Sequence, residues 1–324
     1  MCRLATLMLA LAAIIVVASI ASAQDTYPTR PITLIAPFAA GGSVDLVSRI
    51  LAEGLTARLG QPVIVDNRPG GNGIIGIREA LRAKPDGYTL LLGSVGSNIT
   101  PSLMQSNFPF DPLRDYVPLA MVAEWTAILV VKQELAPNTV QEFIAYARAR
   151  PGKINFGATG HGTFSHLMSE VFMQQTGISV QYVQYKGGSQ GTADLLGGTI
   201  DAQMMSSAVA AGQGDNTRLK FLAIANKQRL PILPSIPTLE EVGISGVTQT
   251  AWQGVFSTPS VPQPLRDRIA REVFAITNDP AFQQKLRQSG FEPLPLNSAA
   301  TERMYREELR QWTTLIKERG LAGR

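Results

Sequence analysis

Cysteine and histidine are nearly absent from this 324-residue chain. Cys2 is the only cysteine, and the two histidines are His161 and His166. Beyond position 2 the chain therefore offers no disulfide, no thiolate nucleophile and no cysteine metal site. The histidines are five positions apart, which places them on different faces of a helix and argues against a zinc pair. We expect neither a metal nor a cofactor.

Charge of either sign is also scarce. The chain has 29 basic and 25 acidic residues, a formal net charge of +4, and charged residues make up 17% of it. No basic run is interleaved with aromatic residues, so we expect no nucleic acid as a partner. The slight positive excess would instead help a cleft to attract anions.

Long hydrophobic runs are missing except at the N-terminus. Residues 4–20 are apolar or small, follow Arg3 and precede Ala-Ser-Ala at 21–23. This order is typical of a secretory signal peptide over residues 1–23, so we expect cleavage after Ala23, a mature chain that begins at Gln24, and export to the periplasm. An uncleaved membrane anchor is the alternative.

The rest of the chain alternates short β-rich segments with amphipathic ones, as α/β sheets do. Its length of about 300 residues exceeds what one hydrophobic core usually organises, so two domains are expected. The clearest unit is a strand at 31–38, a small-residue loop at 39–43 and a helix at 46–59 that Gly60 ends. Further strands are expected at 62–65, 88–92, 128–132 and 153–158, further helices at 74–83, 140–149, 164–175, 264–277, 280–289 and 299–319, and further α/β segments at 180–185, 192–196, 200–205 and 219–225.

Two loops, 39–45 and 159–166, place glycines and hydroxyl residues between the end of an expected strand and the start of an expected helix. The first turn of a helix has unpaired backbone N–H groups and a positive dipole end, and glycine lets an anion approach the backbone. The pattern therefore favours a carboxylate site. The alternative is that Ser43, Asp45, Thr163 and Ser165 are ordinary helix caps and that the glycines only turn the chain.

Two other kinds of site are disfavoured. The glycine pattern at 71–76 matches a dinucleotide fingerprint, but no acidic residue ends the following strand near 92–94 to grip a ribose. Ser165 lacks the flanking glycines of a nucleophile elbow. An enzyme remains an alternative because fold alone does not decide function.

A series of short segments carries a family resemblance along the whole expected mature chain. They are Tyr-Pro-Thr-Arg-Pro-Ile at 27–32, Pro-Phe-Ala-Ala-Gly-Gly-Ser-Val-Asp at 37–45, Val-Asp-Asn-Arg-Pro-Gly-Gly-Asn-Gly at 65–73, Pro-Asp-Gly-Tyr-Thr-Leu at 85–90, Pro-Gly-Lys at 151–153, residues 160–166, Tyr-Lys-Gly at 185–187, Leu-Pro-Ile-Leu-Pro at 230–234, Ile-Pro-Thr at 236–238 and Trp-Gln-Gly-Val-Phe at 252–256. In this ordered set the chain resembles the substrate-binding proteins of tripartite tricarboxylate transporters, the Bug or TctC family.

The resemblance implies an α/β fold of the two-lobed periplasmic binding protein class (type II, Venus-flytrap), with two crossing hinge strands near 125–131 and 250–257. Residues 24–125 and 252–324 would form the first lobe, and the inserted residues 126–251 the second. The two special loops would then lie one in each lobe and face each other across the cleft.

The resemblance also implies which residues bind the ligand, chiefly through backbone amides, small hydroxyls and water. From the two loops these are Phe38, Ala40, Gly41, Gly42, Ser43, Asp45, Gly160, Gly162 and Thr163. Asn67, Ser94, Ser97, Tyr185 and Ser206 are expected at loop ends that border the cleft, with cap or core roles as the alternative. His166 is read as a structural helix residue. The sequence departs from the family pattern at His161, Gln184 and residues 204–207.

The implied function is to capture a small carboxylate outside the cytoplasmic membrane and to deliver it to the membrane subunits of a tripartite tricarboxylate transporter. No catalysis is expected, and the protein is expected to be a monomer. The alternatives are a periplasmic subunit that reports its ligand to a membrane sensor, and an enzyme built on the same two-lobed fold. A dicarboxylate, a tricarboxylate, an acidic amino acid and an aromatic acid all remain open as the ligand.

Overall fold

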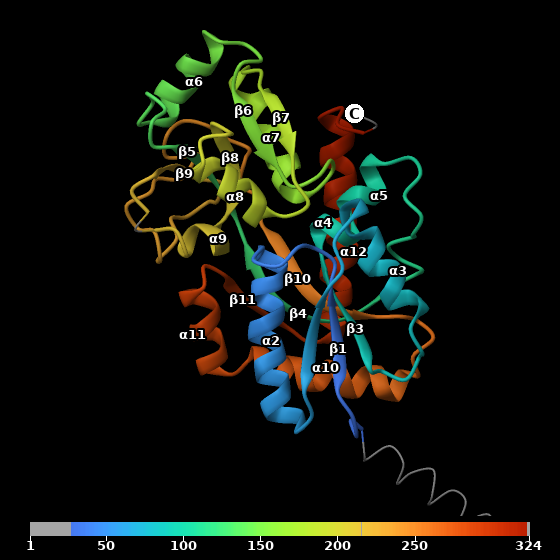
Figure 1. The fold of residues 1–324 in the computed structure, drawn as a ribbon. Helices are drawn as coiled ribbons and strands as arrows, with labels where there is room; N and C mark the ends of the chain where they lie inside the picture. Colours follow the sequence, from blue (N-terminus) through green and yellow to red (C-terminus); the bar gives the residue numbers. More distant parts are fainter. Residues whose placement is uncertain (1–26, 215, 323–324) are drawn as a thin grey trace, which may run out of the picture.

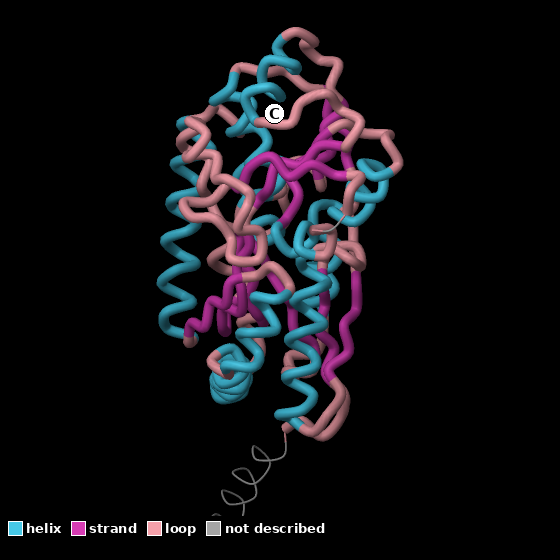
Figure 2. Tube along the Cα trace, turned by 90° about the vertical axis from the view of Figure 1, so that its left-hand side faces the viewer, coloured by secondary structure: helices cyan, strands magenta, loops and turns pink. Residues whose placement is uncertain are grey.

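The computed structural model describes residues 27–214 and 216–322, and it contains two separate β-sheets (Figure 1). Figures 1 and 2 show an elongated molecule with one sheet towards each end and helices outside them. The expected signal peptide lies outside the described residues. Within them, no helix has both the length and the apolar character that crossing a bilayer requires.

The first sheet has six strands in the order β11-β4-β10-β3-β1-β2. β1 pairs in parallel with β2 and β3, whereas β10 runs antiparallel to both β3 and β4. The central strands are almost entirely buried, as expected for strands covered on both faces. The strands are β1 (Ile32–Ala36), β2 (Val63–Asn67), β3 (Thr89–Ser94), β4 (Val117–Trp125), β10 (Ala251–Ser257) and β11 (Glu292–Leu296).

Helices from both ends of the chain cover the first sheet, so the first lobe is built from two distant parts of the sequence (Figure 1). They are α2 (Ser43–Leu59), the one-turn helix η1 (Gly71–Gly73), α3 (Ile74–Arg82), α4 (Val95–Asn98), α5 (Thr100–Met104), α10 (Gln263–Thr277), α11 (Pro280–Gln288) and α12 (Ser298–Glu318).

The second sheet has five strands in the order β7-β6-β8-β5-β9 and belongs to the second lobe. β6 pairs in parallel with β7 and β8, and β5 runs antiparallel to β8 and β9. Its elements are β5 (Ala127–Lys132), α6 (Val140–Arg148), β6 (Asn155–Ala158), α7 (Phe164–Thr176), β7 (Gln181–Gln184), α8 (Gly188–Leu196), β8 (Ala202–Ser206), α9 (Ser207–Ala211) and β9 (Leu219–Ile224).

The chain passes between the two sheets at Thr126, the single residue between β4 and β5. Thr126 is buried, and its hydroxyl donates to the carbonyl oxygen of Ala225 at 2.6 Å, beside the start of the return path to β10. This crossing lies inside the expected segment 125–131, and β10 coincides with the expected segment 250–257. The role of these segments as hinges and the lobe boundaries at 125/126 and 251/252 remain predictions.

Most of the expected elements are present within a few residues of their predicted ends, for example the last helix, expected at 299–319 and found at Ser298–Glu318. The sequence reasoning missed two strands of the first sheet, β4 in its interior and β11, the edge strand Glu292–Leu296. Prolines at 293 and 295 argue against a strand, but an edge strand tolerates proline because one side of it needs no donor.

Candidate functional site

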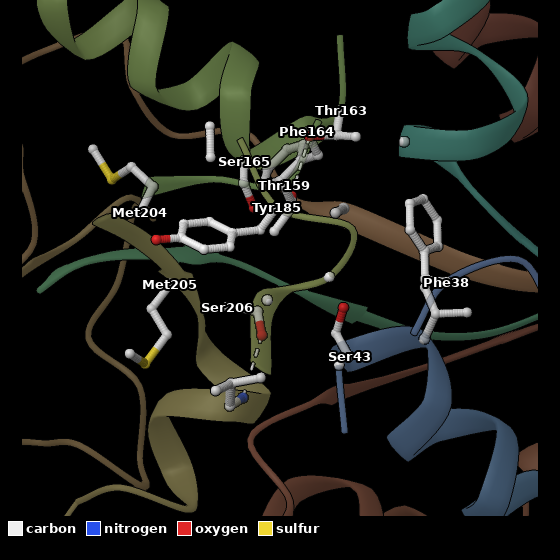
Figure 3. Close-up of a pocket in the computed structure, with 18 of the residues that line it drawn as sticks. Phe38, Ser43, Thr159, Thr163, Phe164, Ser165, Tyr185, Met204, Met205 and Ser206 are labelled. Atoms are coloured by element: carbon white, nitrogen blue, oxygen red, sulfur yellow. Dashed lines mark hydrogen bonds between the residues drawn. The ribbon is translucent and has the colours of Figure 1, made fainter. Parts of the chain in front are cut away.

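A pocket lies where the two lobes meet, at the ends of β1, β3, β6, β7 and β8 (Figure 3). The empty space within it is about 750 Å³, including the part that opens to solvent. None of the residues that line it carries a formal charge. They are Phe38, Gly42, Ser43, Val44, Ser94, Gly96, Trp125, Gly157, Ala158, Thr159, Thr163, Phe164, Ser165, Tyr185, Gly187, Gly188, Gln203, Met204, Met205, Ser206, Val209 and Ala251.

Among the described residues, three helices of eight or more residues begin at this pocket. Their N-cap residues are Gly42 for α2, Thr163 for α7 and Gly187 for α8, and all three line it. None of the three makes a side-chain hydrogen bond to the first turn of its helix. The backbone N–H groups of these first turns are therefore left available to a ligand, and the positive ends of three helix dipoles converge on one space.

Helices that begin elsewhere are capped more often. α6, α11 and α12 each have a side-chain oxygen that accepts from the third residue beyond the cap; the three cap residues are Thr139, Asp279 and Asn297. α3 and α10, with Gly73 and Pro262 at the cap position, lack such a bond. Of the four residues that the cap alternative names, Ser43, Thr163 and Ser165 make no side-chain cap bond to their helices. Asp45 accepts from the backbone N–H of Gly41, directly before the N-cap of α2, so for this residue a capping role remains.

Three serine hydroxyls in the pocket have no acceptor among the described residues. The Oγ atoms of Ser43 and Ser165 have no hydrogen-bond partner in the described part of the chain. Ser206 Oγ accepts from the backbone N–H of Val209 at 3.2 Å, which leaves its own proton available. Ser43 comes from the first lobe and the other two from the second (Figure 3), so both lobes offer donors to the same space.

Other hydroxyls at the pocket are committed to protein partners. Thr163 Oγ1 donates to the carbonyl oxygen of Gly160 at 3.0 Å. Ser94 and Ser97 satisfy each other in a capping box at the start of α4. Tyr185 donates its phenol proton to Asp194 Oδ2 at 2.7 Å, and burial together with this carboxylate raises the pKa of Tyr185 to about 12. Tyr185 therefore offers its ring rather than its hydroxyl to a ligand.

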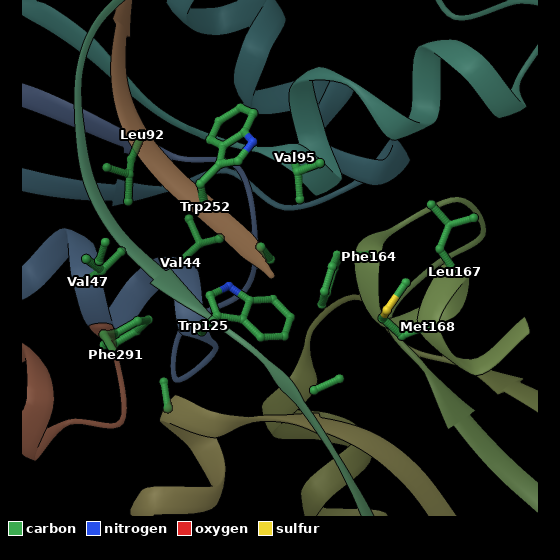
Figure 4. Close-up of a cluster of buried hydrophobic side chains, with 14 of the residues drawn as sticks. Val44, Val47, Leu92, Val95, Trp125, Phe164, Leu167, Met168, Trp252 and Phe291 are labelled. Carbon is green, nitrogen blue, oxygen red and sulfur yellow. The ribbon is translucent and has the colours of Figure 1, made fainter. Parts of the chain in front are cut away.

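Large apolar side chains form the rest of the wall. Trp125 and Phe164 pack edge to face with ring centroids 4.9 Å apart. Figure 4 shows Trp125 between side chains of the first lobe, such as Val44, and side chains of α7. The apolar core is thus continuous from one lobe to the other beside the pocket.

The structure brings half of the predicted site residues to the pocket. Those that line it are Phe38, Gly42, Ser43, Ser94, Thr163, Tyr185 and Ser206. Those that do not are Ala40, Gly41, Asp45, Asn67, Ser97, Gly160 and Gly162. Ligand binding by any of them stays a prediction.

Asp45 and Asn67 brace the first loop. Asp45 Oδ2 accepts from the backbone N–H of Gly41 at 2.9 Å, and its carboxylate forms a salt bridge with Arg49 at 2.9 Å. Burial opposes ionisation of Asp45, but the hydrogen bonds from Arg49 and Gly41 outweigh it and lower the pKa of this carboxyl. Asn67 Nδ2 donates to the carbonyl oxygen of Phe38 at 3.2 Å. Both side chains shape the loop from outside the pocket.

The two special loops border the pocket, and each also approaches a separate part of the opposite lobe. A Cβ at Gly41 would lie 3.3 Å from Ser189 Cβ, and Ser189 Oγ donates to the carbonyl oxygen of Ala40 at 2.9 Å. A Cβ at Gly162 would lie 3.4 Å from Met104 Sδ. The start of α8 therefore faces the first loop, a feature that the sequence reasoning missed although Gly-Gly-Ser follows the strand there at 187–189.

Two of the residues that depart from the family pattern, His161 and Gln184, contact the loop before α7 or the helix itself. Gln184 Oε1 accepts from the backbone N–H of Gly160 at 3.0 Å. His166 Nδ1 accepts from the backbone N–H of Gly162 at 3.3 Å, and the rings of His161 and His166 lie 4.8 Å apart. Burial, and secondarily His161, lowers the pKa of His166 to about 4, so the imidazole is a neutral acceptor near pH 7. His166 therefore has a backbone partner in its own loop and does not line the pocket, and its purely structural role stays a prediction.

A family model described as "Tripartite tricarboxylate transporter family receptor" matches residues 47–321. Among curated relatives, protein BugT of Bordetella pertussis is 31% identical over 297 residues, which cover 91% of this chain and 91% of BugT.

Two solved structures resemble the chain over nearly its whole length. The periplasmic binding protein BugD superposes with a TM-score of 0.87 at 31% identity, covering 92% of this chain and 100% of BugD. R. palustris Rpa4515, solved with adipate, superposes with a TM-score of 0.88 at 29% identity and the same coverage.

Proposed function

Because the chain belongs to the tripartite tricarboxylate transporter receptor family, we propose that it captures a small carboxylate in the pocket between its lobes and delivers it to the membrane subunits of a transporter. The family consists of substrate-binding proteins and not of enzymes, so the chain is a periplasmic solute-binding protein. Its location in the periplasm requires export, and we propose that removal of residues 1–23 accompanies it.

The convergence of three uncapped helix N-termini on a pocket without a charged side chain carries this proposal. A carboxylate accepts hydrogen bonds from backbone N–H groups, and each helix end contributes about 0.3–1 kcal/mol, more where it is partly buried. The protons of Ser43, Ser165 and Ser206 would supply further donors. Backbone and hydroxyl donors thus replace the arginine or lysine that a charged ligand would otherwise need.

The apolar wall favours a carboxylate that has a hydrocarbon body. Phe38, Met204 and Met205 supply surface with no polar partner for extra hydroxyl groups. The adipate bound by Rpa4515, which is 29% identical, is an acid of this kind. We therefore place aliphatic carboxylates first among the candidate ligands.

A thermal-shift screen of the protein from Gln24 onwards tests the proposal. Adipate, malate, citrate, glutamate and benzoate form the panel, and adipamide serves as the control because it keeps the length of adipate but has no charge. Unfolding and refolding the protein beforehand removes any ligand retained during purification. We expect at least one acid to raise Tm, by mass action on the native state, and adipamide to leave it unchanged. An equal shift by the amide, or none by any acid, would refute the carboxylate site.

Delivery to a transporter is tested by uptake in the organism of origin. Deletion of the gene should abolish uptake of the labelled acid that the screen identifies, and the restored gene should return it. Unchanged uptake together with loss of a transcriptional response to the acid would identify a sensor subunit instead.

A further inference from the structure

The loop that precedes α7 is held by side chains of the opposite lobe. Asn72 Nδ2 donates to the carbonyl oxygen of His161, and Thr100 Oγ1 donates to the carbonyl oxygen of Gly162 at 2.6 Å. Gln105 Nε2 is 3.4 Å from the same His161 oxygen. All three donors belong to the first lobe, whereas both acceptors lie directly before the N-cap of α7 in the second.

Asn72 makes this contact from an unusual backbone conformation. Its φ of 55° and ψ of 40° place it in the left-handed region, which asparagine tolerates better than most side chains. The opposing residue is Gly160, at which a Cβ would collide with Asn72 Oδ1. The two positions are therefore matched: one lobe offers an amide on an unusual turn, and the other offers a residue without a side chain.

The second lobe holds the same loop through its N–H groups. Gly160 N–H donates to Gln184 and Gly162 N–H donates to His166, both within the second lobe. The first lobe instead bonds to carbonyl oxygens of the same loop, those of His161 and Gly162. Neither Asn72 nor Thr100 lines the pocket. Their effect on a ligand would be exerted through the start of α7.

We propose that Asn72 and Thr100 form an interlobe clasp that positions the N-terminus of α7 and retains the ligand by holding the lobes closed. The proposal rests on the proposed function, since it assigns to both residues a role in ligand retention. The bonds exist only when the lobes are together, so the clasp acts mainly on the rate of ligand release.

Three substitutions isolate the clasp. Asn72→Gly removes the amide and keeps the left-handed backbone, which glycine adopts readily. Thr100→Val removes the hydroxyl and keeps the shape of the side chain. Thr100→Ser is the matched control, because it retains the hydroxyl that donates to Gly162.

Ligand affinity and release rate provide the first measurement, with the acid that gives the largest thermal shift. We expect Asn72→Gly and Thr100→Val each to release ligand about five times faster and to bind it about fivefold more weakly. This factor corresponds to the net free energy that one hydrogen bond usually contributes. Thr100→Ser should stay within twofold of the unmodified protein. Unchanged release from both Asn72→Gly and Thr100→Val would overturn the proposal.

Hydrogen exchange without added ligand provides a second measurement, which separates failure of the clasp from failure of the proposed function. We expect the backbone amides of residues 160–166 to exchange faster in Asn72→Gly and Thr100→Val than in the unmodified protein, and α6 to exchange equally in all. Equal exchange at 160–166 would refute the clasp even if carboxylates bind. Faster exchange there, with no acid bound by any variant, would leave the clasp standing and refute the carboxylate ligand.

Discussion

Ser165 and Ser169 lie one helical turn apart on α7, but only Ser165 lines the pocket. Ser169 Oγ donates to the carbonyl oxygen of Ser165 at 2.7 Å inside the helix. We expect Ser165→Ala to weaken carboxylate binding about tenfold, because a hydrogen bond to a charged group is lost, and Ser169→Ala to leave it unchanged. Calorimetric titration of both variants measures the difference. Equal affinities would place the ligand away from the start of α7.

His166 should make the stability of the protein fall in mild acid. Burial, with His161, lowers its pKa in the folded protein to about 4, whereas an unfolded histidine has a pKa of about 6.5. The unfolded state therefore takes up the proton first, and the stabilisation present above pH 6.5 is lost as the pH falls towards 4. Glu170 and Tyr182 also face this imidazole, at 3.9 Å from Nε2 and 5.1 Å between ring centroids respectively.

The measurement is urea unfolding at pH 7.5 and pH 5. His166→Asn is the control, since an amide oxygen can replace Nδ1 as the acceptor for Gly162 but does not titrate. Between the two pH values the unmodified protein should lose about 2 kcal/mol more unfolding free energy than the variant. Parallel losses would show that His166 is not the group responsible.

The loop between β6 and α7 depends on glycines in the left-handed region, and Gly162 has a φ of 83°. Valine there would be strained and would press on Met104 of the opposite lobe. Gly177 ends the same helix with a φ of 64° and has open space around it, so Gly177→Val has the backbone strain without the interlobe contact.

We expect Gly162→Val to weaken ligand binding at least tenfold and Gly177→Val to reduce stability by about 1 kcal/mol or more with affinity retained. Circular dichroism verifies that both variants are folded, and calorimetric titration gives the affinities. Normal binding by Gly162→Val would show that ligand affinity does not depend on the close packing of this loop against the first lobe.

Closure of the whole molecule should be visible in tryptophan fluorescence. Of the three tryptophans, only Trp125 lines the pocket, and it contacts Phe164 of the opposite lobe. Trp252 is buried within the first lobe beside Phe256. Trp312 of the first lobe also packs on Phe164, with ring centroids 5.9 Å apart. We expect ligand to change the emission of the unmodified protein and of Trp252→Phe, and the change to be smaller in Trp125→Phe, where only Trp312 still contacts the opposite lobe. A full change in Trp125→Phe would mean that the lobes do not close around this residue.

For the molecule as a whole, local sequence patterns predicted the helices and strands better than they predicted which of these lie against one another. Periodicity and glycine positions indicated α2, α7 and α12 within a few residues, since these signals act over neighbouring turns. They also indicated that the loops before α2 and α7 are suited to an anion. The contribution of α8 and Trp125 was missed, because nothing near Gly187 in the sequence tells which loop of the other lobe it will face.

The sequence by itself determined the α/β elements, the family to which the chain belongs and the presence of glycine and hydroxyl residues at two helix starts. Only the tertiary structure decided which of these groups share the pocket. It brings Ser43, Ser165 and Ser206 together and leaves Asp45, Asn67 and Gly162 as supports outside. The physical reason is that the pocket lies between two lobes. Which backbone and hydroxyl donors remain unpaired there is set by long-range packing and hydrogen bonding, which no local pattern encodes.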